Sequence, residues 1–219
     1  MSENTETTRW WFVRHAPVLD VVGLIYGADD VACDTSDRPS FEVLAQTLPA
    51  RAVWMTSHLS RTVKTAAAIR AAGLDFPEAV VEPDIGEQNF GDWQGRSWDQ
   101  MQADDPEGYA TFWQTPARSA PPGGESFADL IDRAGRVIDR YTRDHAGRDI
   151  VAVCHGGTIR AALAHVLGLP PETGMAISVG TLSMTRVEHV PGGLLKGRGG
   201  AWRVTGVNIP AGHPNGGKP

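Results

Sequence analysis

Two histidines in this chain each follow a short apolar run, in a setting that suits an anion. Residues 10–13 lead into Arg14 and His15, and residues 150–154 lead into His155. Both runs have the length and composition of strands. In open α/β sheets, ligands bind just beyond the carboxyl ends of the strands. We therefore expect the two imidazoles and the guanidinium to meet in one crevice, which would suit a phosphoryl group better than a metal ion or an acyl ester.

Three further residues would complete a site for phosphoryl transfer. Arg61 lies where a turn opens a helix, Glu87 lies in a loop, and Gly156 begins the helix that follows His155. Arginine presents planar, bidentate donors to phosphate oxygens, and glycines at a helix start let backbone N–H groups approach an anion. An imidazole can take the phosphoryl group as a nucleophile, and a carboxyl can protonate the leaving oxygen. Together these are the parts of a covalent phosphoryl-transfer site that needs no metal.

Apolar periodicity and turn residues predict the elements that would hold these groups. Strands are predicted at residues 9–14, 51–56, 80–82, 149–154, 177–187 and 201–207. The last two are expected to pair antiparallel across the Gly-rich segment 192–200. Helices are predicted from a cap at Ser40 to Leu48, from the turn at 57–62 to about Ala72, from Ser126 to near Gly147, and from Thr158 to Leu167.

This alternation of strands and helices predicts an α/β fold, a three-layer α/β/α sandwich whose mostly parallel central sheet has an antiparallel edge strand. We expect one domain over residues 9–209, a flexible tail at residues 1–8 and a disordered tail at residues 210–219. Residues 92–124 are rich in aromatic residues and then in Pro and Gly, and are predicted to form a lid or insert. Most of its aromatic side chains are expected to form a small core, with one or two facing the pocket: Trp93, Trp98, Tyr109, Phe112 and Trp113.

The composition is that of an ordinary globular protein. Of the 219 residues, 41% are hydrophobic and 21% are charged, and the formal net charge is -6. A nucleic-acid surface needs a basic face, and no Lys/Arg run occurs, so we expect no nucleic-acid partner. We expect no membrane partner, because no apolar stretch is long enough to span a bilayer and residues 1–9 lack a signal pattern. Two cysteines do not make a disulfide framework in a chain this long, which favours a reduced, cytoplasmic location.

Five short motifs follow one another in an order that resembles a known family. They are Arg-His after the first strand, Ser-x-x-x-Arg-Thr-x-x-Thr-Ala after the second, Glu-x-x-Phe-Gly-x-Trp-x-Gly in mid-chain, Gly-Gly-Glu-Ser, and His-Gly-Gly-x-Ile-Arg. Each motif alone is weak, but five in order are specific. Over roughly residues 9–187 the chain resembles the histidine phosphatase superfamily, also called the phosphoglycerate-mutase-like superfamily.

The resemblance implies a role for each site residue. His15 matches the nucleophile that becomes phosphorylated, and Arg14 and Arg61 match the arginines that clamp the phosphate. His155 matches the second histidine, which binds the phosphoryl group. Glu87 matches the general acid, which later acts as the base that activates water. The amide at the start of the helix after His155 is expected to add a further donor.

The chain departs from the family pattern just after the predicted nucleophile. The family usually has Gly there, then Glu-Thr and an Asn a few residues on, whereas this chain has Ala16, Pro17, Val18 and Leu19. The departure removes a side-chain contact to phosphate. An Arg-His-Ala-Pro start resembles a bacterial branch that includes α-ribazole-phosphatase-like proteins.

A metal site and a thiol nucleophile are the weaker interpretations of these residues. His15 and His155 are zinc-ligand types, but Arg14 and Arg61 would repel a cation and no Cys/His ligand spacing accompanies them. We therefore expect neither a metal nor a cofactor. Cys154 is expected to be a small buried hydrophobe, since a residue and its strand neighbour point to opposite faces. Structural roles are expected for the remaining histidines, His58, His145, His165, His189 and His213.

These features predict hydrolysis of a small phosphorylated metabolite through a phosphohistidine intermediate. The first alternative is a phosphoglycerate-mutase-type phosphotransferase, which must hold a bisphosphate in two orientations and so needs a second cationic subsite. Between residues 92 and 124 the only basic residues are Arg96 and Arg118, and acidic residues outnumber them. The second alternative is a non-catalytic phosphate-binding or interaction module on the same fold, against which the intact set of site residues argues.

Overall fold

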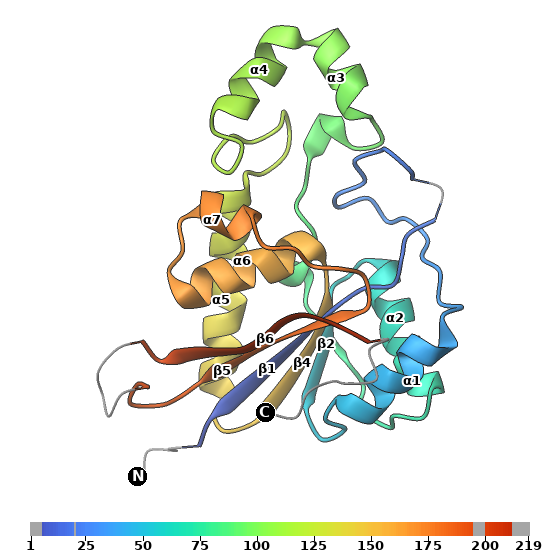
Figure 1. Ribbon diagram of the computed structural model, residues 1–219, viewed down its shortest axis with the longest axis vertical. Helices are drawn as coiled ribbons and strands as arrows, with labels where there is room; N and C mark the ends of the chain where they lie inside the picture. Colours follow the sequence, from blue (N-terminus) through green and yellow to red (C-terminus); the bar gives the residue numbers. More distant parts are fainter. Residues whose placement is uncertain (1–5, 20, 195–199, 212–219) are drawn as a thin grey trace.

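The computed structural model describes residues 6–19, 21–194 and 200–211, and within them six strands form one sheet (Figure 1). The strands are β1 (Thr8–Arg14), β2 (Val53–Thr56), β3 (Val80–Val81), β4 (Asp149–Cys154), β5 (Ser183–His189) and β6 (Trp202–Pro210). Their spatial order is β3-β2-β4-β1-β5-β6. The first four in this order run parallel, β5 is antiparallel to β1, and β6 is antiparallel to β5. The predicted mostly parallel sheet and the antiparallel pairing of its last two strands are confirmed.

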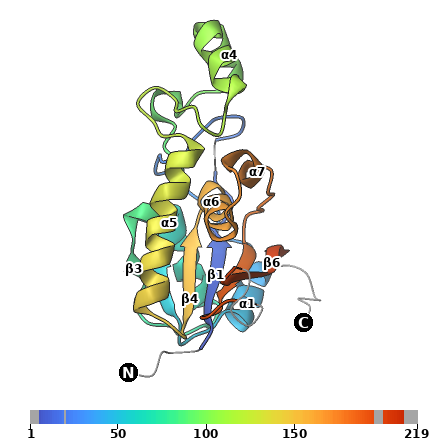
Figure 2. The same ribbon diagram turned by 90° about the vertical axis from the view of Figure 1, so that its left-hand side faces the viewer.

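Helices cover both faces of this sheet, as the predicted three layers require (Figure 2). They are α1 (Arg38–Thr47), α2 (Ser60–Ala71), α3 (Trp98–Asp104), α4 (Pro106–Gln114), α5 (Phe127–Asp144), α6 (Gly156–Leu167) and α7 (Pro171–Met175), with short 3-10 turns η1 (Pro83–Ile85) and η2 (Gly91–Trp93). The α1 and α2 helices pack on one face and α5 and α6 on the other.

Side-chain alternation along β1 and β4 builds the two cores. Trp10 and Phe12 pack with α5 and α6, whereas Val13 packs with α1 and α2. In the same way Ile150 of β4 packs in the core under α5 and α6, and Val151 packs in the core under α1 and α2. Both strands are therefore buried on two faces, which explains why their sequences are continuous apolar runs rather than alternating patterns.

The first predicted helix has a different cap from the one expected. The α1 helix begins at Arg38, and the Asp37 carboxylate accepts the backbone N–H of Ser40, so Asp37 and not Ser40 is the cap. The reason is Pro39, whose fixed φ suits the first turn of a helix and lets α1 start earlier.

At both ends the ordered structure extends slightly into the tails that the sequence predicted. Thr8 already belongs to β1, is buried, and accepts a hydrogen bond from the Gly147 amide. At the other end β6 continues to Pro210, and Ala211 is buried in the core beside α1. Residues 1–5 and 212–219 of the predicted tails, including His213, lie outside the described residues, and the predicted domain limits remain predictions.

The aromatic segment at 92–124 holds two helices that the sequence analysis did not predict. The α3 and α4 helices project beyond the end of the sheet (Figure 1). Ile25, Trp93, Met101 and Phe112 form a small separate core there, with Phe90, Trp98 and Tyr109 packed against it. The expectation that most of these aromatic residues form a core is confirmed, although 45% of Trp113 is exposed. We call residues 92–122 the insert.

The long loop between β1 and α1 connects the insert to the body. Ile25 pairs with Arg96 as an isolated β-bridge, and the Gly95 amide donates to the Ile25 carbonyl at 2.7 Å. The Gln94 side chain accepts from the Ala28 amide. The loop that follows His15 is thus held by the insert on one side. Within the described part of the chain, none of the helices is both long and apolar enough to cross a membrane.

Candidate active site

The two histidines are brought together by the pairing of β1 with β4. Arg14 and Cys154 are register partners at the carboxyl ends of these parallel strands, so the next residue in each chain segment lies beside the other. The His15 amide donates to the Cys154 carbonyl at 2.9 Å. The imidazole centroids of His15 and His155 are 5.1 Å apart, and neither residue is exposed. The two imidazoles lie close together, as predicted from the sequence.

One nitrogen of the His15 ring is hydrogen-bonded and the other is not. Nδ1 lies 2.7 Å from the Ala16 carbonyl, which can only accept, so Nδ1 carries the proton. Nε2 is then the unprotonated nitrogen; it is buried and has no hydrogen-bond partner among the described residues. Burial lowers the pKa of His15 to about 3, and the charges of Arg61 and Arg14 act in the same direction. The ring is neutral at physiological pH.

His155 differs in that both of its ring nitrogens are engaged. Arg61 Nε donates to His155 Nδ1 at 3.2 Å, so the remaining ring proton is on Nε2. Nε2 donates to Ser57 Oγ at 2.8 Å, and this hydroxyl is in contact with Thr62 Oγ1 at 3.1 Å. Burial holds the pKa of His155 well below its ordinary value, and nearby positive charge, including that of Arg61, adds to the effect.

Arg61 lies in the first turn of α2 and is fully buried, unlike an arginine on the solvent-facing surface of a helix. Its Nη1 donates to the Asp29 carbonyl and its Nη2 to the Gly27 carbonyl, both on the long loop. The guanidinium also lies 5.2 Å from the centroid of the Tyr26 ring. Burial lowers the pKa of Arg61, and the nearby Glu87 carboxylate opposes that shift. The loop therefore positions a cation next to both histidines.

Arg14, the second predicted phosphate-binding arginine, lies against the start of α6. Arg14 Nη1 donates to the Val179 carbonyl at 2.6 Å, while its buried Nε has no partner in the described part of the chain. Gly156 is the first residue of α6, and a Cβ there would come within 3.3 Å of Arg14 Nε. Glycine lets this guanidinium approach the positive end of the helix, where the first N–H groups lack intrahelical partners.

Glu87 reaches the same helix start from the loop before η2. Its Oε2 accepts the Gly157 amide at 3.2 Å, and its Oε1 accepts the Gln88 amide at 3.0 Å. A Cβ on Gly157 would lie 2.3 Å from Glu87 Oε1, closer than real contacts allow. The second glycine after His155 thus makes room for this carboxylate.

The structure brings all six predicted site residues to the carboxyl ends of β1 and β4, and adds two that the sequence analysis did not assign. Ser57 accepts from His155, and Gly157 donates to Glu87. The signal for both was present, because each occupies a fixed place in a motif, but a hydroxyl or a glycine carries no chemistry until its neighbour is known.

Cys154, His165 and His189 have the structural surroundings expected of them, whereas His58 lies close enough to the site for its charge to lower the pKa of His155. Cys154 is fully buried, and burial raises the pKa of its thiol. His165 contacts the Asp139 carboxylate, and His189 packs edge-on against Trp202. His58 is exposed, and a Cβ on Gly86 would lie 3.1 Å from its ring. No group of three or more His, Cys, Asp or Glu side chains is arranged to hold a metal ion among the residues that the structure describes.

Comparison with known families agrees with this geometry. The family model described as "Histidine phosphatase superfamily (branch 1)" matches residues 10–197. A solved structure of a mycobacterial glucosyl-3-phosphoglycerate phosphatase superposes with a TM-score of 0.76 at 25% sequence identity, over 93% of this chain and all of the other. The fold predicted from the motifs is therefore that of its structural neighbours.

Several relatives in sequence are named as phosphatases. The chain is 33% identical to the glucosyl-3-phosphoglycerate phosphatase of Mycolicibacterium vanbaalenii, over 78% of each protein. It is 27% identical to the adenosylcobalamin/alpha-ribazole phosphatase of Salmonella typhimurium, over 74% of this chain and 81% of that protein. It is 35% identical to a metal-independent phosphoserine phosphatase of Arabidopsis thaliana, but this match spans only 44% of the plant protein.

Proposed function

The chain belongs to the histidine phosphatase superfamily, and from that premise we propose that it hydrolyses a small phosphorylated metabolite through a phosphohistidine formed on His15. The observation that carries the proposal is the His15 ring. The imidazole is buried and neutral, its Nε2 has no partner among the described residues, and the charges of Arg61 and Arg14 act on it, so it is suited to attack an electrophilic phosphorus.

The neighbouring groups support the roles that the motifs imply. Arg14 and Arg61 carry the positive charge that would offset the phosphoryl oxygens, and the Gly156 amide is directed from a helix start. His155 is oriented by Arg61 at Nδ1 and by Ser57 at Nε2, so that neither ring nitrogen is free to attack phosphorus, and we assign it to binding of the phosphoryl group. These donors precede the reaction and need no reorganisation during it, which is the efficient form of electrostatic catalysis.

The reaction we propose has two displacements. His15 Nε2 forms a bond to phosphorus as the bond from phosphorus to the ester oxygen breaks, and protonated Glu87 gives its proton to the departing oxygen. Water then attacks the phosphorus, the Glu87 carboxylate takes a proton from that water, and the bond from phosphorus to Nε2 breaks to release inorganic phosphate. Glu87 ends each cycle as it began, protonated, and no metal takes part.

Hydrolysis is favoured over mutase chemistry by the state of the basic residues on the insert. Arg96 is paired with Asp104, and Arg118 is paired with Glu172 at 2.8 Å. Neither is left to bind a second phosphate, and the aromatic side chains of the insert suit a neutral or partly apolar substrate group. The relatives named above for phosphoserine, glucosyl-3-phosphoglycerate and alpha-ribazole support a small metabolite as the substrate, and we propose a cytoplasmic location for this activity.

The intermediate can be tested directly. The purified protein is mixed with radiolabelled nitrophenyl phosphate, quenched within milliseconds, and assayed for label that is stable in alkali and lost in acid. We expect labelling in the wild type and none in His15→Ala, with His165→Ala as the matched control that keeps it. Labelling of His15→Ala would show that another residue is the nucleophile.

The same assay examines metal independence. After exhaustive chelation we expect both labelling and turnover to persist, because Arg14, Arg61 and the amides at the start of α6 supply the positive charge that a metal would otherwise supply. A large loss that a divalent cation alone restores would contradict the proposal.

A further inference from the structure

Glu87 sits at the base of the insert, where two segments far apart in the sequence are held together. The Glu125 amide donates to the Asn89 carbonyl at 2.9 Å, and the Asn89 amide donates back to Glu125 Oε1 at 3.0 Å. Gln88 Nε2 donates to the Glu125 carbonyl. Further out along the same two segments, a Cβ on Gly91 would lie 2.1 Å from the Pro122 carbonyl. We call these two segments, residues 87–91 and 122–125, the neck of the insert.

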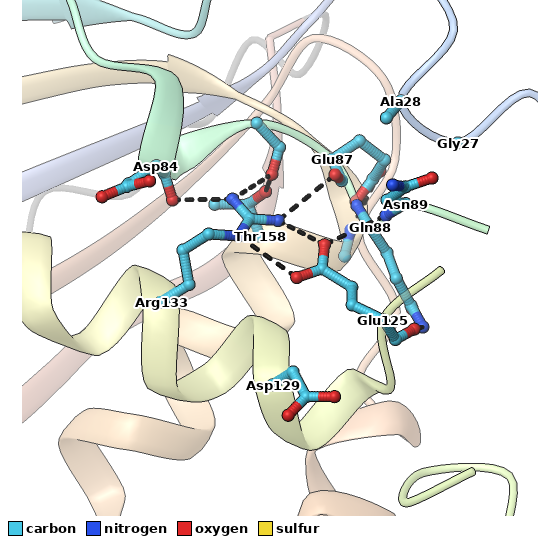
Figure 3. A network of polar contacts seen from close by, with 12 residues as sticks. Gly27, Ala28, Asp84, Glu87, Gln88, Asn89, Glu125, Asp129, Arg133 and Thr158 are labelled. Carbon is cyan, nitrogen blue, oxygen red and sulfur yellow. Dashed lines mark hydrogen bonds and ion pairs between the residues drawn. The ribbon is translucent and has the colours of Figure 1, made fainter. Parts of the chain in front are cut away.

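A single side chain of α5 ties this neck to the body of the protein. Arg133 Nη2 and Nε donate to the two oxygens of Glu125, at 2.5 and 3.2 Å (Figure 3). Only 18% of the Arg133 side chain and 20% of the Glu125 side chain are exposed, so the pair is largely shielded from solvent. Such a bidentate pair fixes geometry as well as charge.

The same guanidinium holds the backbone that leads to Glu87. Arg133 Nη1 donates to the carbonyls of Asp84 and Gly86, and Nη2 is 3.4 Å from the carbonyl of Glu87 itself. Asp84 lies within the short turn η1, and Gly86 and Glu87 follow it; the last carbonyls of such a turn have no partner within the turn. From α6, Thr158 Oγ1 donates to the Gly86 carbonyl at 2.9 Å, so the segment before Glu87 is held from two helices.

We propose that Arg133, paired with Glu125, is the positioning residue that sets where the Glu87 carboxylate stands relative to His15. The proposal rests on the proposed function, in which Glu87 is the proton donor. Arg133 does not touch the reacting atoms; it fixes the main chain on which Glu87 is mounted and couples it to the neck of the insert. A shift of the insert is therefore transmitted to the acid through this ion pair together with the hydrogen bonds of the neck.

Lysine cannot replace Arg133 in this arrangement. The contacts use three nitrogens of a planar fork that point to Glu125 on one side and to a row of carbonyls on the other. A lysine ammonium is one point with three donors, and it cannot span both. We therefore expect Arg133→Lys to resemble Arg133→Met and not the wild type.

The test uses leaving-group dependence, which a merely structural role would not change. Single-turnover rates are measured for a series of aryl phosphates from nitrophenyl to phenyl, in the wild type, Arg133→Met, Glu125→Gln and Glu87→Gln. A good leaving group departs without a proton, whereas a poor one needs the acid. A misplacement of about 1 Å can cost about 10²-fold. We expect Arg133→Met to lose at least about tenfold more rate on phenyl phosphate than on nitrophenyl phosphate.

Arg143→Met is the matched control. Arg143 lies on the same helix and also pairs with a carboxylate, but that carboxylate belongs to the next residue of the helix, Asp144, and not to the neck. Its loss should leave the dependence on leaving group unchanged even where it lowers thermal stability. Equal loss on every substrate in Arg133→Met, as expected from general unfolding, would overturn the proposal.

A double variant separates failure of this inference from failure of the proposed function. If Arg133 acts through Glu87, adding Arg133→Met to Glu87→Gln causes no further change in leaving-group dependence. If Glu87→Gln alone shows no such dependence, the acid role of Glu87 is wrong. If Glu87→Gln shows it and Arg133→Met does not, the acid role stands and the positioning role is wrong.

Discussion

The two histidines stand at equivalent places, one residue beyond adjacent parallel strands, but their surroundings are opposite. The Nδ1 of His15 donates to the carbonyl of the next residue, and its Nε2 has no partner in the part of the chain that the structure describes. His155 has a donor on one nitrogen and an acceptor on the other. The strand ends position both rings. The hydrogen bonds from α2 and from the turn before it hold His155 but not His15, and this distinguishes the two rings.

Arg61 is the residue on which this difference depends most. It donates to His155 and its charge helps to keep His15 neutral. We expect Arg61→Lys to lose about 10²–10³ in rate, by analogy with removal of one donor that stabilises a transition state. Turnover of nitrophenyl phosphate measures the loss. Arg70→Lys on the same helix is the control, because Arg70 contacts backbone carbonyls of the following loop and the Phe76 ring and not the histidines. Near-normal activity of Arg61→Lys would reduce its role to long-range charge.

Ser57 tests the fixed ring alone. Ser57→Ala leaves the buried Nε2–H of His155 without an acceptor, a cost of about 1–3 kcal/mol. We expect the rate to fall about tenfold while phosphohistidine still forms, since about 1.4 kcal/mol corresponds to a factor of ten. Thr142→Val is the control, because Thr142 accepts from the Trp10 ring in the same way far from the site. A Ser57→Ala enzyme with unchanged rate would mean that Arg61 alone orients His155.

The pH dependence of stability tests the burial of His15. Unfolded His15 binds a proton below its ordinary pKa of 6.5, whereas folded His15 does so only near 3. Between these values the unfolded state holds more protons, so stability is full above pH 6.5 and falls as the pH is lowered. One such histidine contributes a loss of about 1 kcal/mol from pH 6.5 to 5.5. Urea unfolding of wild type and His15→Asn at these pH values measures it. Parallel pH profiles for the two proteins would place His15 in contact with solvent.

The strand-end residues were predictable because burial on two faces leaves a strong mark in a sequence. The runs before His15 and His155 are apolar throughout, and the glycines after His155 mark a close approach. The α3 and α4 helices were not predicted, since a Pro at residue 106 and a Gly at residue 108 lie among their few turns. Their caps, Ser97 with Gln100 and Asp105 with Gly108, were the local signals that could have revealed them.

The positioning of Glu87 could not be predicted from the sequence. Arg133 is one of several arginines that recur along α5, and Arg136, Arg140 and Arg143 look equivalent to it in the sequence. What distinguishes Arg133 is the return of the chain at Glu125 to the segment before Glu87, and that is a property of the tertiary fold. Long-range polar contacts of this kind have no period to detect.

The neighbour relation of β1 and β4 also has a consequence for synthesis of the protein. Within this sequence β1 leaves the ribosome well before its partner in the sheet, β4, which follows five of the helices. Until β4 has emerged, His15 has no neighbouring carbonyl to fix its main chain and no second imidazole beside it. Contacts of such long sequence separation form slowly and late. A nascent chain that ends before β4 therefore carries His15, the proposed nucleophile, without the partners that position it, and we expect activity only after β4 has been made.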